Sequence, residues 1–143
     1  MDPPFRWMIG VFIRVLLDTH LWIWWTHDDP ALPTEFKQAL EGQKASGIGV
    51  SIFSCWEVAK LVEVGKLSLP MSVDQWIADA LVPSWVELLP LTTEIVIEST
   101  RLPTPFHKDP ADQIIVATAR QLNCPLVTCD KQIRDYPHVK LLL

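Results

Sequence analysis

The sequence predicts an α/β fold, a three-layer sandwich whose central, mostly parallel sheet of four to five strands carries helices on both faces. Short apolar runs alternate along the chain with stretches that have the spacing of amphipathic helices. The apolar runs are continuous, as in strands that are buried on both faces of a sheet. The chain has 143 residues, of which 49% are hydrophobic and 20% charged, a balance typical of one globular domain. We therefore divide it into an N-terminal extension, residues 1–13, and a single domain, residues 14–143.

Each predicted strand is a short run of apolar or β-branched residues that stops at a polar residue or a turn. The first is Val15–Leu17, which stops at Asp18. The other runs are residues 47–51, 86–91 and 126–129, and residues 139–143 are a candidate fifth strand. Because helices are predicted between successive strands, we expect neighbouring strands to be parallel.

The helices are predicted from capping residues at their starts and stop signals at their ends. They cover residues 21–25, 34–41, 54–65, 72–81, 92–102 and 109–123. Ser54 and Ser72 are each followed three residues later by Glu or Gln, which is the capping-box pattern. Asp109 and Pro110 give the clearest start, with Asp at the N-cap and Pro at the first helical position. Asn123 is the expected left-handed stop of that helix.

The charge and cysteine content exclude several classes of protein. A net charge of -5 argues against non-specific coating of nucleic acid, although carboxylates that hold a metal also count as negative. Three cysteines without a C-x-x-C pair predict neither a disulfide framework nor structural zinc, and they favour a reducing, cytoplasmic location. The apolar run Trp7–Leu17 is interrupted by Arg14 and is too short to cross a bilayer, so we expect no membrane association.

Four acidic residues from distant segments are expected at one edge of the sheet. Asp18 ends the first strand and Asp130 ends the fourth, while Glu57 and Asp112 lie on the helices that start at Ser54 and Asp109. In parallel sheets the ligand site lies beyond the carboxyl ends of the strands. Two carboxylates 4 Å apart repel by about 4 kcal/mol at an effective dielectric of about 20, so protons or a cation must neutralise such a cluster. Oxygen ligands suit Mg²⁺ or Mn²⁺, which leaves an activated water beside a phosphodiester.

Taken singly, each of these acids also has a structural interpretation as a helix cap, a capping-box partner, a group that favours the helix dipole, or a turn residue. Separate structural roles do not explain why all four acids are expected at the same edge of the sheet. We therefore prefer the interpretation of the four acids as one catalytic cluster.

Four stretches, in this order along the chain, resemble the PIN-domain family and, within it, the VapC-type ribonuclease toxins of type II toxin–antitoxin pairs. They are LLDTHLW at residues 16–22, the segment 50–67 with SCWEVA and GKL, HKDPADQIIVATA at 107–119, and LVTCD at 126–130. Each motif is weak alone, whereas the four in order are specific. The resemblance covers nearly the whole chain from about residue 14.

The resemblance implies a PIN-like fold and a Mg²⁺- or Mn²⁺-dependent endoribonuclease. It also implies an RNA substrate, a small cognate antitoxin that blocks the site, and a homodimer. The acidic positions of the family, which are catalytic and bind the metal, fall on Asp18, Glu57, Asp112 and Asp130. The supporting polar positions fall on Ser51 and Thr128, with Asp109 as a supporting N-cap. Gln113 departs from the family, because many relatives have Arg there, which puts a local basic contact in doubt.

Two other functions compete with this interpretation. One is a non-catalytic PIN-fold module that binds RNA or protein, and the complete set of acids argues against it. The other is a phosphoacceptor domain of receiver type. That domain usually has an acidic pair after its first strand, where this chain has Asp18 alone.

Several aromatic and basic residues lie close to these motifs. Three of the seven tryptophans lie together on the first predicted helix, and we interpret Trp22, Trp24 and Trp25 as an interface with a second copy or a partner. His20 and His107 are near the proposed site in sequence, and we prefer structural roles for both. Four basic residues follow the acids closely and are candidates for a phosphate track: Lys60, Lys108, Lys131 and Arg134.

Overall fold

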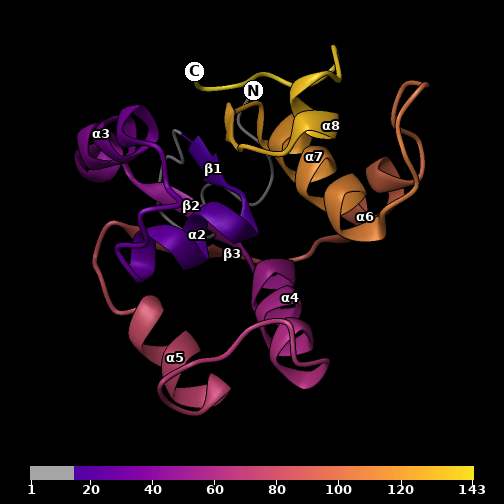
Figure 1. The fold of residues 1–143 in the computed structure, drawn as a ribbon. Helices are drawn as coiled ribbons and strands as arrows, with labels where there is room; N and C mark the ends of the chain where they lie inside the picture. Colours follow the sequence, from indigo (N-terminus) through magenta and orange to yellow (C-terminus); the bar gives the residue numbers. More distant parts are fainter. Residues whose placement is uncertain (1–14) are drawn as a thin grey trace.

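A parallel sheet of four strands forms the centre of the structure, a computed structural model that describes residues 15–143 (Figure 1). The strands are β1 (Val15–Leu17), β2 (Ile48–Ser51), β3 (Val86–Leu89) and β4 (Leu126–Val127), in the order β3-β2-β1-β4. All neighbouring pairs are parallel. The expected last strand at 139–143 contributes one isolated bridge, between Leu126 and Leu141. The predicted extension, residues 1–13, lies outside the described residues.

Helices cover both faces of this sheet, which confirms the predicted three-layer α/β architecture. They are α2 (Thr19–Thr26), α3 (Thr34–Gln43), α4 (Ile52–Glu63), α5 (Val73–Ala80), α6 (Thr93–Ser99), α7 (Pro110–Leu122) and α8 (Lys131–Arg134), with a 3₁₀ turn η1 (Lys44–Ser46). No helix within residues 15–143 is long and apolar enough to cross a membrane.

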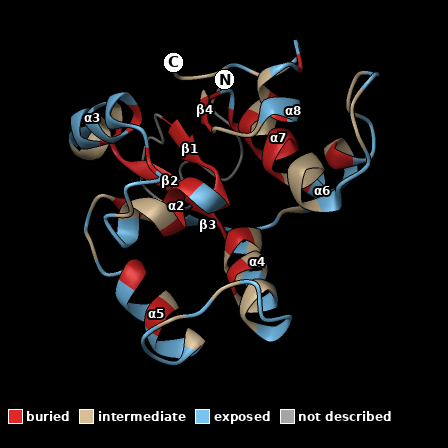
Figure 2. Cartoon of the chain, in the orientation of Figure 1, coloured by how far each residue is buried: buried red, intermediate tan, exposed pale blue. Residues whose placement is uncertain are grey.

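The strands β1, β2 and β4 are buried on both sides, as the red colour of β1 and β2 in Figure 2 shows, whereas Glu87 and Leu88 of the edge strand β3 are partly exposed. Val15 and Leu17 of β1 pack into a cluster with residues of α2, α3 and α5. Leu16, between them, points to the opposite cluster with residues of α7 and α8. This alternation explains the continuous apolar runs of the sequence, because successive side chains of one strand face two different helix layers.

Most helix starts follow the caps expected from the sequence. Asp18 caps α2 by accepting a hydrogen bond from Thr19 N, and Asp109 caps α7 by accepting one from Ala111 N. Asn123 ends α7 in the left-handed conformation, with φ 51° and ψ 47°. A short side chain that tolerates this conformation ends a helix cleanly.

The capping box predicted for Ser54 and Glu57 is wrong. The helix begins two residues earlier than predicted, at Ile52, and its N-cap is Ser51, whose Oγ accepts a hydrogen bond from Phe53 N at 3.0 Å. The chain turns from β2 directly into α4 without a loop. Ser54 is therefore inside the helix, where its buried hydroxyl makes a tertiary contact.

The interface interpretation is also wrong for Trp22, which is part of the core. Trp22 is 2% exposed, and its ring packs edge-on against Trp76 at a centroid distance of 5.0 Å. Trp25 is partly buried and packs against Trp85 at 4.6 Å. Through these two indoles, α2 packs against α5 and against the segment before β3.

Leu16 and Leu88 provide a matched test of this arrangement. Leu16 is fully buried in the central strand, so Leu16→Ala should lower the free energy of unfolding by about 2–5 kcal/mol. Leu88 lies on the edge strand and is 38% exposed, so Leu88→Ala should cost less than about 1 kcal/mol. Urea titrations followed by circular dichroism measure both values. Equal losses for the two variants would contradict the assignment of strand order.

Candidate active site

The four predicted acids come together at the carboxyl edge of the sheet. Asp18 follows β1 and Asp130 lies three residues after β4, while Glu57 is in the second turn of α4 and Asp112 in the first turn of α7. The charges of Asp130, Asp18 and Glu57 all raise the pKa of the Asp112 carboxyl. Segments that are far apart in the sequence therefore place their carboxylates within electrostatic reach of one another.

Asp18 is the most buried of these acids, with 6% of its surface exposed. Its Oδ1 accepts a hydrogen bond from Thr19 N at 2.8 Å, and its Oδ2 accepts one from Thr128 Oγ1 at 2.6 Å. Burial raises the pKa of this carboxyl, while the hydrogen bonds from Thr128 and Thr19 act in the opposite direction. Two fixed donors therefore set the orientation of the Asp18 carboxylate.

Thr128 connects the ends of the neighbouring strands β1 and β4. Besides donating to Asp18, Thr128 Oγ1 accepts a hydrogen bond from Asp130 N at 3.0 Å. The side chain is fully buried, so its hydroxyl has no access to water. Thr128 thus fixes the relative position of Asp18 and Asp130, as its predicted supporting role requires.

Glu57 is held by a hydroxyl that the sequence analysis did not assign to the site. Thr19 Oγ1 donates to Glu57 Oε1 at 2.6 Å and also lies 2.7 Å from Ser54 Oγ. Burial is the main cause that raises the pKa of the Glu57 carboxyl, and the negative charge of Asp18 raises it further. Thr19 therefore ties the second acid to the segment that carries the first. The only signal in the sequence is its position directly after Asp18.

Asp112 has a strongly perturbed carboxyl. Burial and then the charges of Asp130, Asp109, Asp18 and Glu57 raise its pKa to about 7. Close to neutral pH this carboxyl is therefore only partly ionised, because an additional negative charge at this position is opposed by the other acids.

His107 lies beside Asp112, with its Nε2 3.0 Å from Asp112 Oδ2. The angles between the two groups are not those of a hydrogen bond, and Nε2 is the one buried side-chain nitrogen or oxygen within residues 15–143 that has no partner. Gln113 donates from Nε2 to His107 O at 3.2 Å. Gln113 thus supports the loop that carries His107.

Ser51, Asp109 and Asp130 have clear structural roles in addition to their place at this edge. Ser51 caps α4, and Asp109 caps α7 with hydrogen bonds from Ala111 N at 2.9 Å and Asp112 N at 3.4 Å. Asp130 is the N-cap of α8, a helix that the sequence analysis did not predict. The N-cap predicted for Asp109 is confirmed, whereas Asp130 caps a short helix where a turn was the structural alternative, and each cap also orients the start of a helix at the acid cluster.

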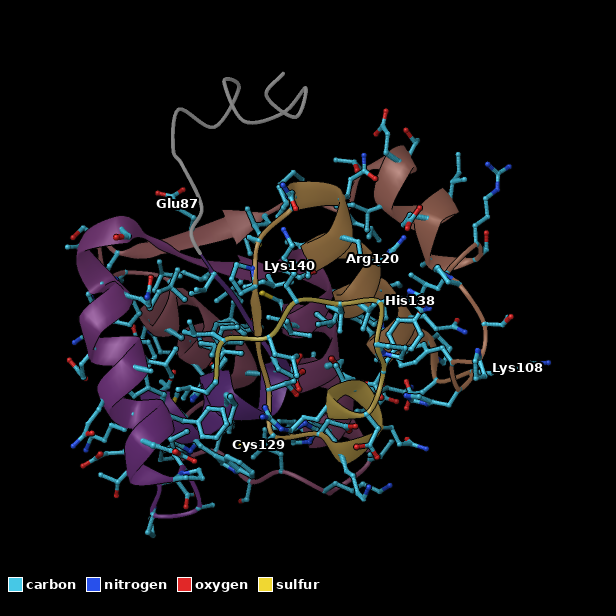
Figure 3. All side chains as sticks on the ribbon, turned by 90° about the horizontal axis from the view of Figure 1, so that it is seen from above. Glu87, Lys108, Arg120, Cys129, His138 and Lys140 are labelled. Carbon is cyan, nitrogen blue, oxygen red and sulfur yellow. The ribbon has the colours of Figure 1, made fainter. Side chains whose placement is uncertain are left out.

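The predicted phosphate track does not form a continuous basic surface. Lys60 pairs with Glu63 and Lys131 with Asp135, and Arg134 donates to the carbonyl oxygens of Thr128 and Leu143. Figure 3 shows Lys108 pointing outward from the loop that precedes α7. Arg134 therefore supports the chain around the site, while Lys60 and Lys131 are exposed and each is paired with an acid of its own helix region.

The four acids offer oxygen ligands of the kind that a hard divalent cation prefers, but they are not arranged around a common metal position. Among residues 15–143, no group of three or more His, Cys, Asp or Glu side chains is arranged to hold a metal ion. The carboxylates of Asp18 and Glu57 are instead held by hydroxyl and amide groups. The donors of the four acids are all oxygens, and their mutual repulsion is the kind that Mg²⁺ or Mn²⁺ relieves.

Known proteins with similar sequences share this arrangement of strands and helices over most of the chain. The family model described as PIN domain matches residues 15–139. Ribonuclease VapC22 of Mycobacterium tuberculosis is 32% identical over 124 residues, which cover 87% of this chain and 92% of that protein.

Two solved structures are similar in fold. VapBC2 from Rickettsia felis, bound to a DNA fragment from their promoter, contains a chain with a TM-score of 0.67 and 18% identity, covering 91% of this chain and 98% of that chain. A toxin–antitoxin complex from Klebsiella pneumoniae contains a chain with a TM-score of 0.59 and 25% identity, covering 87% of this chain and 94% of that chain. With its sheet order, its acidic edge and a family match over nearly all described residues, this chain belongs to the PIN domain family.

Proposed function

We propose that this chain is a Mg²⁺- or Mn²⁺-dependent endoribonuclease and the toxin of a toxin–antitoxin pair. The observation that carries the proposal is the Asp112 carboxyl, whose pKa rises to about 7 because it is buried beside the charges of other acids. A site that crowds carboxylates in this way favours a divalent cation over protons near neutral pH. The relative at 32% identity is named a ribonuclease, which supports RNA as the substrate.

Asp18, Glu57, Asp112 and Asp130 are the residues that would hold the metal. When bound, the ion supplies charge neutralisation for the phosphodiester and lowers the pKa of a water molecule that attacks phosphorus. Thr128 and Thr19 position the carboxylates of Asp18 and Glu57 through the hydrogen bonds described above. Cleavage would leave a 5′-phosphate and a 3′-hydroxyl.

The proposed partner is a small antitoxin protein. The structures of similar fold include VapBC assemblies and a toxin–antitoxin complex. An acidic cluster at an accessible edge is complementary to a basic side chain, and Arg is the side chain that binds carboxylates in a bidentate manner. We therefore propose that an antitoxin Arg enters the cluster and blocks it.

We further propose a homodimer in the cytoplasm. All three cysteines are free thiols, as expected of a protein from a reducing compartment.

Catalysis is tested by Asp112→Asn, which removes one charge and keeps the shape of the side chain. We expect wild type to cleave structured RNAs with Mn²⁺ or Mg²⁺ and not with EDTA, and Asp112→Asn to cleave no faster than the EDTA control. The matched control is Asp74→Asn, because Asp74 is also an acid in the first turn of a helix but is exposed on α5. Circular dichroism should give the same spectrum for all three proteins.

Full activity of purified Asp112→Asn would contradict the proposed mechanism. RNA binding without cleavage by the wild type in any metal would favour the alternative function, a non-catalytic PIN-fold module that binds RNA or protein.

Stability should depend on pH and metal together. The folded pKa of Asp112 is raised to about 7 from an ordinary value near 4, so the native state binds more protons than the unfolded state between these values. The stabilisation of the folded state by proton binding at Asp112 is fully present below about pH 4. It is lost as the pH rises through about 7. We expect the free energy of unfolding in EDTA to fall between about pH 5 and pH 7.5. Mn²⁺ at about 100 times its dissociation constant should restore about 2.7 kcal/mol at the higher pH.

In EDTA, the free energy of unfolding of Asp112→Asn should depend less on pH than that of wild type. Mn²⁺ should also raise the free energy of unfolding of Asp112→Asn by less. Asp74→Asn should behave as wild type in both respects. Urea titrations at the two pH values measure the four free energies for each protein. If Mn²⁺ stabilises Asp112→Asn as much as wild type, the metal binds elsewhere.

The antitoxin proposal predicts a phenotype and a complex. Expression of this chain alone should arrest growth, and co-expression with the protein of the neighbouring reading frame should restore it. The two proteins should co-purify, and substitution of the Arg of the antitoxin should release nuclease activity. If expression of this chain alone does not slow growth and no complex forms, the proposed toxin function is rejected. The proposed nuclease activity is not affected by that outcome.

A further inference from the structure

The first two turns of α4 carry an exposed stacked pair of aromatic side chains. The rings of Phe53 and Trp56 lie 5.1 Å apart, centroid to centroid, at an interplanar angle of 26°. Trp56 is 54% exposed, which is unusual for so large an apolar side chain. Because Phe53 covers one face of the indole and more than half of the residue is exposed, the other face of Trp56 is open to solvent.

This pair lies directly beside the acid cluster. Phe53 precedes Glu57 by one helical turn, so the two side chains are neighbours on the surface of α4, and Trp56 adjoins Glu57 in sequence. Side chains of a helix lean toward its N-terminus. The N-terminus of α4 follows β2 without a loop, at the carboxyl edge of the sheet, so the side chains of Phe53 and Trp56 lean toward the end of the helix that lies at this edge.

We propose that the open face of Trp56 is a stacking site for one unpaired base next to the scissile phosphate, with Phe53 as the second layer of the stack. The inference rests on the proposed ribonuclease function. A phosphate at the acid cluster brings its neighbouring base to the start of α4. An aromatic face accepts any base, since every base has a π-face, and the base must be unpaired to reach it.

The extent of the exposed apolar surface fits a base better than a protein partner. A Trp side chain buries at most about 250 Å² and is half exposed here, whereas a stable protein interface needs about 800 Å² on each partner. Ile52 is the neighbouring exposed apolar residue, at 41%. Beyond Trp56 the exposed face of α4 continues with Lys60 and Glu63, which form an ion pair. Figure 2 shows this mixture of exposed and half-buried surface along α4.

The experiment compares wild type, Trp56→Phe and Trp56→Leu. Phe keeps an aromatic face, whereas Leu keeps apolar bulk without a π-face, and Val64→Ala removes a similarly exposed apolar side chain further along α4 as a control. The probe is a fluorescein-labelled single-stranded oligoadenylate, with Ca²⁺ in place of Mn²⁺ to prevent cleavage and fluorescence anisotropy as the readout. A ribose-phosphate oligomer of the same length without bases is the second probe.

We expect Trp56→Leu to weaken binding of oligoadenylate about tenfold, a loss within the range measured for one stacked base. Trp56→Phe and Val64→Ala should bind it as wild type does. The oligomer without bases should bind wild type and Trp56→Leu equally. The KM for a cleavable RNA should rise in Trp56→Leu, and thermal melts should show that the variant is folded.

Equal binding of oligoadenylate by wild type and Trp56→Leu would overturn the inference, as would equal losses in Trp56→Phe and Trp56→Leu. Loss of antitoxin co-purification in Trp56→Leu with unchanged RNA binding would assign the pair to a protein partner instead. In each of these cases an intact cleavage activity leaves the ribonuclease proposal standing. Absence of cleavage by wild type rejects that proposal separately.

Discussion

The repulsion between carboxylates at one edge of the sheet is the constraint on which the rest of the structure depends. Asp18 and Glu57 are buried far enough that burial itself raises their pKa values, and Asp112 meets the charges of four other acids. An unfolded chain would keep these groups in water and apart. The fold therefore needs groups that hold each carboxylate where it is, and Thr19, Thr128 and the caps of the surrounding helices supply them. The parallel sheet makes this possible, since the ends of β1 and β4 lie side by side and Asp18 N donates to Val127 O at 3.0 Å.

The parts of the fold that follow from local rules were predictable from the sequence. The helix at Asp109 begins and ends where its cap, its proline and Asn123 place it, because each of these signals acts within a few residues. The strand that ends at Asp18 was equally clear, since a short buried run stops at a charge. The acids themselves were assigned from order and spacing, and the mutual effects on their pKa values agree with an acidic cluster at this edge.

The parts that were missed depend on contacts between distant segments. Ser54 and Glu57 have the spacing of a capping box, but α4 starts at Ile52 because the strand before it runs directly into the helix. The hydroxyl that holds Glu57 belongs to Thr19, which is 38 residues away, and no local pattern indicates that contact. The helix capped by Asp130 has only four residues, which is too few for a periodic signal. Trp22 is buried because α5 brings Trp76 against it, and a count of tryptophans along one helix gives no information about that neighbour.

The direction of the hydrogen bonds around Asp18 has a consequence for what the cluster offers to a ligand. Asp130 N donates to Thr128 Oγ1, Thr128 Oγ1 donates to Asp18 Oδ2, and Thr19 N donates to Asp18 Oδ1. The Thr128 hydroxyl has a single proton, which it donates to Asp18. It therefore acts only as an acceptor toward Asp130 N, and this fixes the direction of both hydrogen bonds. Each oxygen of Asp18 thus has one lone pair engaged by the protein and retains another. Because these two donors restrict the rotation of the Asp18 side chain, the two remaining lone pairs point in fixed directions, and Asp18 presents them to a ligand as a rigid acceptor.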